Sequence, residues 1–158
     1  MTDGANRWRL QVATLHEHVA VVEQSAAALR HSLAKCEQVG LKAEYTLDEL
    51  DDFEALSARF ARTADLYTQK LLKSIFLVLR EDAVAFLDKT RLAEQLGIIE
   101  NAEDLAAIRD LRNTIAQEYA VANLNEVFRS TLALSGKLLE VLNSTLRYVQ
   151  EKIPLPPT

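Results

Sequence analysis

The chain has 158 residues, enough for one domain with its own hydrophobic core, and it contains only four glycines and three prolines. All-β sandwiches and barrels need many turns, so this scarcity excludes them and favours helices. The formal net charge of −5 argues against a broad basic face for duplex binding but leaves room for a small phosphate site. We therefore expect residues 1–158 to form a single helical domain.

The composition also bears on the compartment. A single cysteine, Cys36, can form neither a disulfide framework nor a cysteine metal cluster, which fits a reducing cytosol. Residues 1–10 are polar and lack the apolar centre of a signal peptide. The longest apolar run, near residues 75–79, is far shorter than the roughly 20 residues of a membrane helix. We expect a cytoplasmic protein without a membrane segment.

The first expected helix covers residues 8–38. Its apolar residues recur at alternating spacings of three and four, a heptad stripe typical of a helix packed lengthwise against another. Gly40 follows the stripe and predicts the C-terminal cap. The stripe consists of Val12, Leu15, Val19, Val22, Ala26, Leu29, Leu33 and Cys36.

A second helix is expected to begin at Thr46 and to run to about Leu79. Thr46 and Glu49 have the spacing of a capping box, in which each side chain binds a backbone N–H of the first turn. Residues 71–79 are apolar on more than one face, which predicts a central position in the fold. The apolar face includes Leu50, Phe53, Leu56, Phe60, Tyr67, Leu71, Ile75 and Val78.

Three further helices are expected in the second half. A short one over residues 90–96 is predicted to end at Gly97. A third main helix spans about 102–119, with Asn101 as its N-cap and acidic residues in its first turn. The last helix covers about 124–152, and its expected inner stripe is Phe128, Leu132, Ser135, Leu139, Leu142, Leu146 and Val149.

These elements predict an all-α fold, an antiparallel bundle of four to five helices with two long helices. At about 1.5 Å per residue, each long helix measures roughly 45 Å. A compact domain of this size does not need such length. The excess favours either a protruding hairpin or a packed dimer.

Several catalytic classes find no support in the sequence. Motifs of P-loop, dinucleotide-binding, zinc-protease and serine-hydrolase sites are missing. His16 and His18 are two residues apart and point about 200° apart on a helix, so they cannot chelate one ion, and we expect both to face solvent. The acidic residues between 48 and 54 suit a solvated helix start. Cys36 is expected to be a small buried side chain. We expect neither a metal nor a cofactor.

Residues 111–119 form the most informative segment. Arg112 shares a helical face with the apolar Ile108 and Ile115. An arginine in such a stripe is costly unless it is paired or meets an anion. Two interpretations follow, an ion pair with a carboxylate such as Asp65 or an anion-binding site. Composition alone favours the ion pair.

The same segment resembles the signature of the HEPN superfamily, and more narrowly that of HepT-like toxins and nucleotidyltransferase substrate-binding proteins. The family hallmark is an arginine, a polar residue, three more residues and then His-x-Tyr. Residues 53–67 also resemble the second helix of that family, and the likeness covers roughly 45–150. Gln117 stands where the family has its histidine. The motif is matched at Arg112, Asn113, Ala116 and Tyr119.

The resemblance implies an activity and partners. It implies metal-independent RNA cleavage by attack of a ribose 2′-OH, with Arg112 holding the scissile phosphate and Asn113 orienting it. It further implies a homodimer with a composite site at the interface and a small (MntA-like) nucleotidyltransferase as antitoxin. Tyr119 then matches the tyrosine that this partner adenylylates. Alternatively, Tyr119 closes the helix end against the core with its hydroxyl in water.

Gln117 departs from the family pattern in a way that matters for catalysis. Histidine titrates near neutral pH and transfers protons, whereas a glutamine amide only forms hydrogen bonds. Loss of a general acid or base costs about 10²–10⁴-fold in rate. Asp65 and Tyr119 are the candidates to compensate for the missing histidine.

Arg112 and Gln117 are also five residues apart, about 140° around a helix, so one continuous helix does not aim both at one phosphate. Two copies of the motif meeting across a two-fold axis, or a helix that ends near residue 117, would do so.

Three functions therefore remain open. The first is a HepT-like toxin component, either an RNase or a degenerate one. The second is a non-catalytic subunit that binds a nucleotide or the nucleotidyltransferase. The third is a plain helical scaffold.

Overall fold

The structure is a computed structural model that describes residues 2–117 and 124–157. Within these ranges the chain is helical with no strand, which confirms the predicted all-α bundle. Tyr119 lies outside the described residues. The elements in chain order are α1 (Thr2–Val39), α2 (Leu47–Leu66), the π-helical segment η1 (Tyr67–Leu72), α3 (Lys73–Leu79), α4 (Phe86–Gln95), α5 (Ala102–Gln117) and α6 (Leu124–Lys152).

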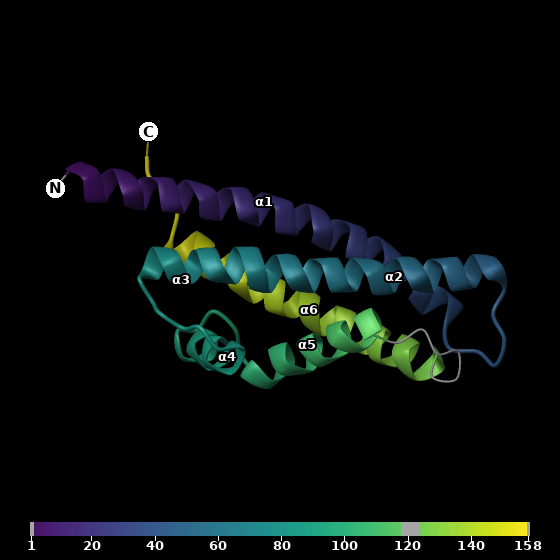
Figure 1. Cartoon of the computed structure of the whole chain (residues 1–158). Coiled ribbons are helices and arrows are strands. Elements are labelled where there is room, and N and C mark those ends of the chain that lie inside the picture. The colour runs from purple at the N-terminus through teal and green to yellow at the C-terminus, as the bar shows by residue number, and fades with distance from the viewer. Residues whose placement is uncertain (1, 118–123, 158) are drawn as a thin grey trace.

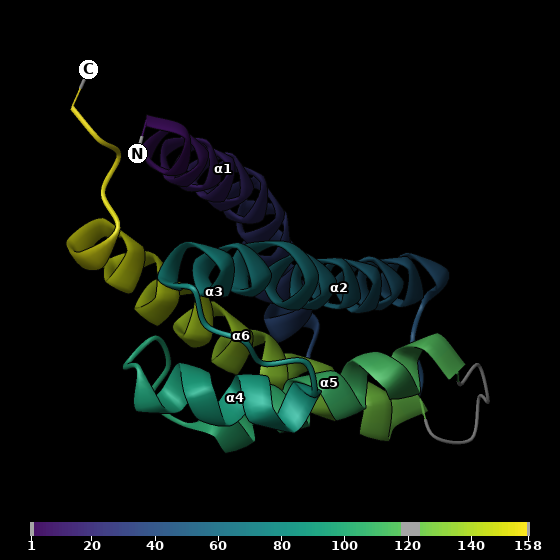
Figure 2. The ribbon, with the colours of Figure 1, turned by 60° about the vertical axis from the view of Figure 1, so that its left-hand side comes forward.

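Two long rods form the frame of the bundle. Helix α1 runs antiparallel to the continuous rod of α2, η1 and α3 (Figure 1). Helix α6 crosses beneath this hairpin and contacts α1, α2 and α5. Helices α4 and α5 lie on the far side of α6 from α1 (Figure 2). The rod α2–η1–α3 therefore faces α1 on one side and reaches α5 on another, as expected for a central element.

The predicted stripe of α1 is buried. Seven of its eight residues lie in the core, and Val19 is half-buried. Gly40 ends the helix in the left-handed region, at φ 70°, and its N–H donates to the Cys36 carbonyl over 2.9 Å. The helix begins at Thr2, six residues before the expected start. Residues 2–10 are all exposed, so a core-facing stripe could not have revealed that first part.

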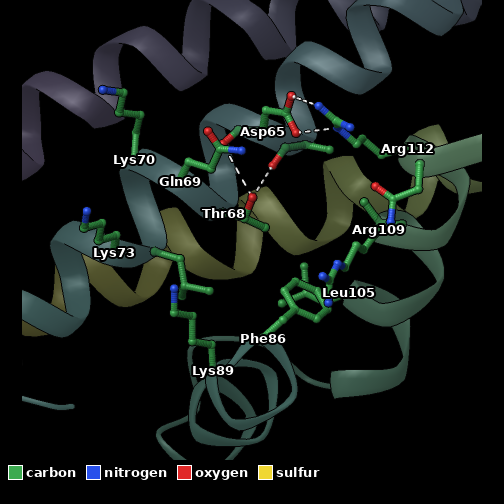
Figure 3. Close-up of a pocket in the computed structure, with 14 residues that line it drawn as sticks. Asp65, Thr68, Gln69, Lys70, Lys73, Phe86, Lys89, Leu105, Arg109 and Arg112 are labelled. Atoms are coloured by element: carbon green, nitrogen blue, oxygen red, sulfur yellow. Dashed lines mark hydrogen bonds and ion pairs between the residues drawn. The ribbon is translucent and has the colours of Figure 1, made fainter. Parts of the chain in front are cut away.

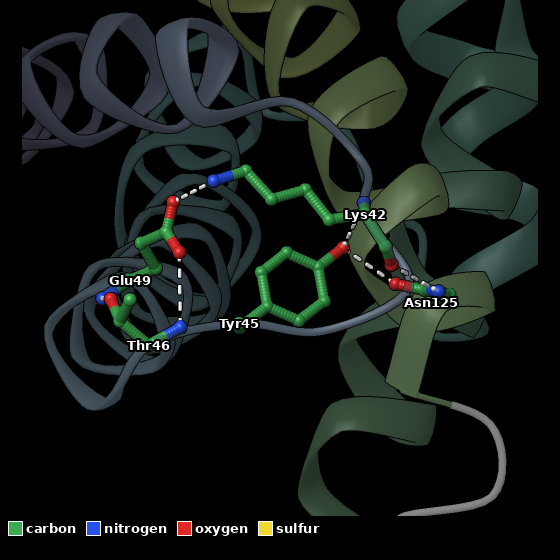
Figure 4. A network of polar contacts seen from close by, with 5 residues as sticks. All are labelled: Lys42, Tyr45, Thr46, Glu49 and Asn125. Carbon is green, nitrogen blue, oxygen red and sulfur yellow. Dashed lines mark hydrogen bonds and ion pairs between the residues drawn. The ribbon is translucent and has the colours of Figure 1, made fainter.

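The start of α2 is held as the sequence predicts. The Glu49 N–H donates to the Thr46 hydroxyl over 3.1 Å, and the Thr46 N–H donates to the Glu49 carboxylate over 3.0 Å. Lys42 pairs with the same carboxylate, and this hydrogen bond lowers the pKa of Glu49. The Tyr45 hydroxyl donates to Asn125 over 2.6 Å, and the Asn125 amide donates to the Lys42 carbonyl over 3.0 Å (Figure 4). The α1–α2 loop is thereby joined to the start of α6.

The second rod contains a feature that the sequence did not predict. Its middle segment, η1, is π-helical, and the Thr68 hydroxyl donates back to the Ala64 carbonyl over 3.0 Å. Tyr67 is fully buried there, and its hydroxyl forms a 2.9 Å hydrogen bond with Thr145 of α6. Burial raises the pKa of Tyr67. Such π segments are frequent at functional sites.

Two helix predictions need correction. Helix α4 begins at Phe86, four residues before the expected start, although the chain turns after it at Gly97 with φ 79° as predicted. The expected stripe of α6 is only partly right, because Leu132, Leu139 and Leu146 are half-buried. Helix α6 packs between several neighbours, so its buried arc is wider and includes Thr131, Leu138, Val141 and Thr145.

The two histidines expected in solvent are half-buried instead. A nitrogen of His16 lies 2.8 Å from the Ile153 carbonyl, and a nitrogen of His18 lies 2.6 Å from the Ser74 hydroxyl. Both contacts come from chain segments far away in sequence, which helical spacing alone cannot indicate. No described helix combines the length and the apolar character needed to cross a bilayer.

Cys36 provides a test of this core. Its thiol is buried and donates to the Asp52 carbonyl over 3.3 Å, and burial, with the Asp52 charge, raises the pKa of Cys36 to about 11. We expect alkylation by iodoacetamide at pH 8 to be at least about 10²-fold slower than that of a free cysteine, because the thiolate is the nucleophile. The rate should rise to that of a free thiol in urea. Equal rates with and without urea would contradict the packing of α1 against α2.

Candidate functional site

The ion pair between Arg112 and Asp65 is the centre of the candidate site. Arg112 on α5 donates from Nε to one Asp65 oxygen over 2.8 Å and from Nη2 to the other over 2.9 Å. Both side chains are 34% exposed. The hydrogen bond to Asp65, with the opposite charge, raises the pKa of Arg112. This confirms the interpretation that Arg112 pairs with Asp65.

A pocket of about 670 Å³ opens beside this pair, between the second rod, α4 and α5 (Figure 3). Its lining also contains apolar residues, among them the buried Leu72, Leu105 and Ile108 and the half-buried Phe86. Thr68 and Gln69 of η1 also line it, so the π-helical segment forms part of the wall. The volume lies in the range of about 300–1,000 Å³ that is usual for ligand pockets.

The pocket is strongly basic although the chain is acidic. Among the residues that the structure describes, five basic side chains and one acidic side chain line it, against a net charge of −5 for the whole chain. The single acid is Asp65, already paired with Arg112. The Arg109 guanidinium lies over the Phe86 ring, 4.2 Å from its centre, a cation–π contact. The other basic residues are Lys70, Lys73 and Lys89.

These three lysines are available to a ligand. Lys70 and Lys73 are exposed and Lys89 is half-buried. In the part of the chain that the structure describes, no ion pair involves any of them. A positive pocket with apolar residues in its lining suits an anion that also carries apolar surface.

The structure brings together some of the predicted site residues and leaves others apart. Arg112, Asn113 and Asp65 all line the pocket. Gln117 lies farther along α5, is exposed, and is not part of the lining. Tyr119, the predicted modification site, lies outside the described residues. Within this chain, therefore, Arg112 and Gln117 do not both line this pocket.

The three histidines of the chain, His16, His18 and His31, all lie on α1, and none lines the pocket. Histidine is the side chain that ordinarily titrates near neutral pH. The described residues also contain no group of three His, Cys, Asp or Glu side chains that could hold a metal ion.

No known protein that we compared matches this chain. This holds for protein-family models, for curated proteins and for solved structures. The HEPN resemblance therefore rests on the motif in residues 112–119 and on the order of the helices.

Sequence reasoning missed Lys70, Lys73, Lys89 and Arg109. A partial signal exists, because Lys70 and Lys73 are three residues apart and share a helical face. Arg109 and Arg112 share a face of α5 in the same way. Nothing in the sequence indicates that these two faces, with Lys89, surround one pocket.

Proposed function

We propose that this chain is a HepT-like component of a HEPN–nucleotidyltransferase toxin–antitoxin pair, and that it binds an RNA phosphate at Arg112. The observation that carries the proposal is the guanidinium of Arg112 at the edge of a basic pocket in an acidic chain. Its two parallel hydrogen bonds to Asp65 have the geometry that arginine also uses for phosphate. A bound phosphate would take the place of this carboxylate.

The reaction would follow from that position. The 2′-OH attacks the adjacent phosphorus, so that the bond from O2′ to phosphorus forms and the bond from phosphorus to O5′ breaks. The proton of the 2′-OH leaves and a proton joins O5′, giving a 2′,3′-cyclic phosphate and a 5′-OH. Arg112 stabilises the charge on the phosphate and Asn113 orients it. Gln117 polarises but transfers no proton, so cleavage is slow.

A homodimer completes this proposal. Arg112 and Gln117 are five residues apart on α5, and only Arg112 lines the pocket. A second protomer across a two-fold axis would supply its own Gln117 beside the first protomer's Arg112. A monomer in solution at micromolar concentration would contradict this part.

The alternative is a non-catalytic subunit that binds a nucleotide or the nucleotidyltransferase. The observation that favours it is the lack of any histidine among the residues that line the pocket. The two functions share Arg112 and differ in whether RNA is cut.

The experiment is cleavage of a tRNA pool in EDTA by the wild-type chain and two variants. Arg112→Ala is expected to lower cleavage by about 10²–10³-fold, because a preorganised charge-stabilising donor is lost. Asp65→Asn is the matched control. It breaks the same ion pair but leaves the guanidinium in place, and we expect it to keep or raise activity.

Each outcome has a distinct meaning. Equal losses of both activity and folded stability in Arg112→Ala and Asp65→Asn would show that the pair only supports the fold, and would contradict phosphate binding. If no chain cuts, but the wild-type chain shifts tRNA in a gel and Arg112→Ala does not, the non-catalytic alternative replaces the RNase. A reading frame for a minimal nucleotidyltransferase beside this one would support both functions over a plain scaffold.

A further inference from the structure

We propose that Lys70, Lys73 and Lys89 form a lysine wall that binds backbone phosphates of single-stranded RNA next to the phosphate at Arg112. The proposal deepens the function above and rests on it for the identity of the polymer. These three lysines lie outside the 112–119 motif. Neither that motif nor the ion pair of Arg112 explains why they surround the same pocket.

The placement of the lysines comes from three elements. Lys70 belongs to η1, Lys73 begins α3 and Lys89 lies on α4. Figure 3 shows the three in a row on one side of the pocket, with Arg109 and Arg112 on the other side. A ligand in the pocket therefore meets positive charge from two sides. A chain of phosphates fits this arrangement better than a single anion does.

Charge and exposure agree with a backbone contact. Exposed ammonium groups are point charges on flexible stems, which suits repeated phosphates without base recognition. Among the described residues Asp65 is the one acid in the lining, against five basic side chains, so the pocket stays positive even when a phosphate displaces Asp65 from Arg112.

The remaining lining favours single-stranded RNA over a duplex. Of the apolar residues in the lining, the half-buried Phe86 can contact sugar or base surface, whereas Leu72, Leu105 and Ile108 are each about 1% exposed. The Arg109 guanidinium lies over Phe86, 4.2 Å from the ring centre, and guanidinium planes and aromatic rings are the groups on which unpaired bases stack. A pocket of about 670 Å³ is of the size usual for small ligands, so an unpaired nucleotide fits it better than a duplex does.

The test measures how salt weakens binding of a short oligouridylate with 2′-O-methyl riboses, which cannot be cut by the proposed reaction. For single strands the logarithm of the affinity falls with the logarithm of salt by about 0.7 per phosphate neutralised. Fluorescence anisotropy between about 50 and 200 mM salt gives this slope. The double variant Lys70→Gln/Lys73→Gln is expected to reduce the slope by about 1.4.

The control is Lys35→Gln/Lys137→Gln, which changes the net charge equally. Both residues are exposed lysines outside the pocket, and both pair with acids. We expect this variant to keep the wild-type slope. Equal slopes in the two double variants, or no binding by the wild-type chain, would overturn the lysine wall. Circular dichroism confirms that each variant is folded.

Two further measurements distinguish a failure of the lysine wall from a failure of the proposed function at Arg112. If Arg112→Ala affects neither cleavage nor binding, but the lysine variant still reduces the slope, the proposed function fails and the lysine wall stands. Free ATP and unlabelled oligomer are also compared as competitors of the labelled oligomer. If both displace it at similar concentrations, the pocket binds free nucleotides, and the assignment to RNA is overturned.

Discussion

Replacing Gln117 by histidine is expected to raise RNA cleavage by about 10²–10⁴-fold, the usual contribution of a general acid or base. Gln117 is exposed on α5, so an imidazole fits there without repacking. The variant restores the full motif of the family that the sequence resembles. The measurement is the rate of tRNA cleavage in EDTA, with wild type and Gln117→His compared at equal concentration.

The pH profile and two controls make this result specific. An imidazole with an ordinary pKa of about 6.5 should give the pH–rate profile of Gln117→His an inflection near neutrality, which we expect the wild-type profile to lack. Gln117→Asn keeps an amide and should show no gain. Adding Arg112→Ala should abolish the gain. No increase in Gln117→His would contradict an RNA-cleaving site at this position.

Replacing Phe53 by alanine is expected to destabilise the fold by about 3–5 kcal/mol, the cost typical of a buried phenylalanine. Phe53 is fully buried on α2 and stacks on Phe128 of α6, with ring centres 4.1 Å apart. Tyr45 meets both rings edge-on at 5.6 Å. The three rings join the α1–α2 loop, α2 and α6, so the cavity would affect all of them.

Urea unfolding followed by circular dichroism measures this effect. The control is Leu47→Ala at the first position of α2, where the side chain is 80% exposed. We expect that variant to change the free energy of unfolding by no more than about 0.5 kcal/mol. Similar midpoints for the two variants would contradict the aromatic cluster as a support of the fold.

The elements governed by local sequence were the ones that could be predicted. The capping box at Thr46 and Glu49 and the left-handed glycines at 40 and 97 depend on neighbours within a few residues. The stripe of α1 depends only on helical period. The ion pair of Arg112 with Asp65 was one of the two interpretations that the sequence left open, because a charge on an apolar face needs a partner or an anion.

Other features depend on contacts between segments far apart in the sequence. The hydrogen bonds of His16 and His18 and the wider buried arc of α6 come from neighbouring helices. The π-helical segment η1 departs from the regular period that sequence patterns assume. The hydroxyl of its buried Tyr67 forms a hydrogen bond with Thr145 of α6. The helical repeat of the second rod cannot predict a partner on another helix.

The sequence by itself therefore determined the helical class, most helix ends and the unusual Arg112, since each follows from backbone hydrogen bonding or from the cost of burying a charge. Only the tertiary structure decided that Lys70, Lys73 and Lys89 share a pocket with Arg109 and Arg112. The physical reason is that packing of apolar faces fixes how helices sit together. The charged side chains at their edges are carried into place by that packing and leave no pattern of their own in the sequence.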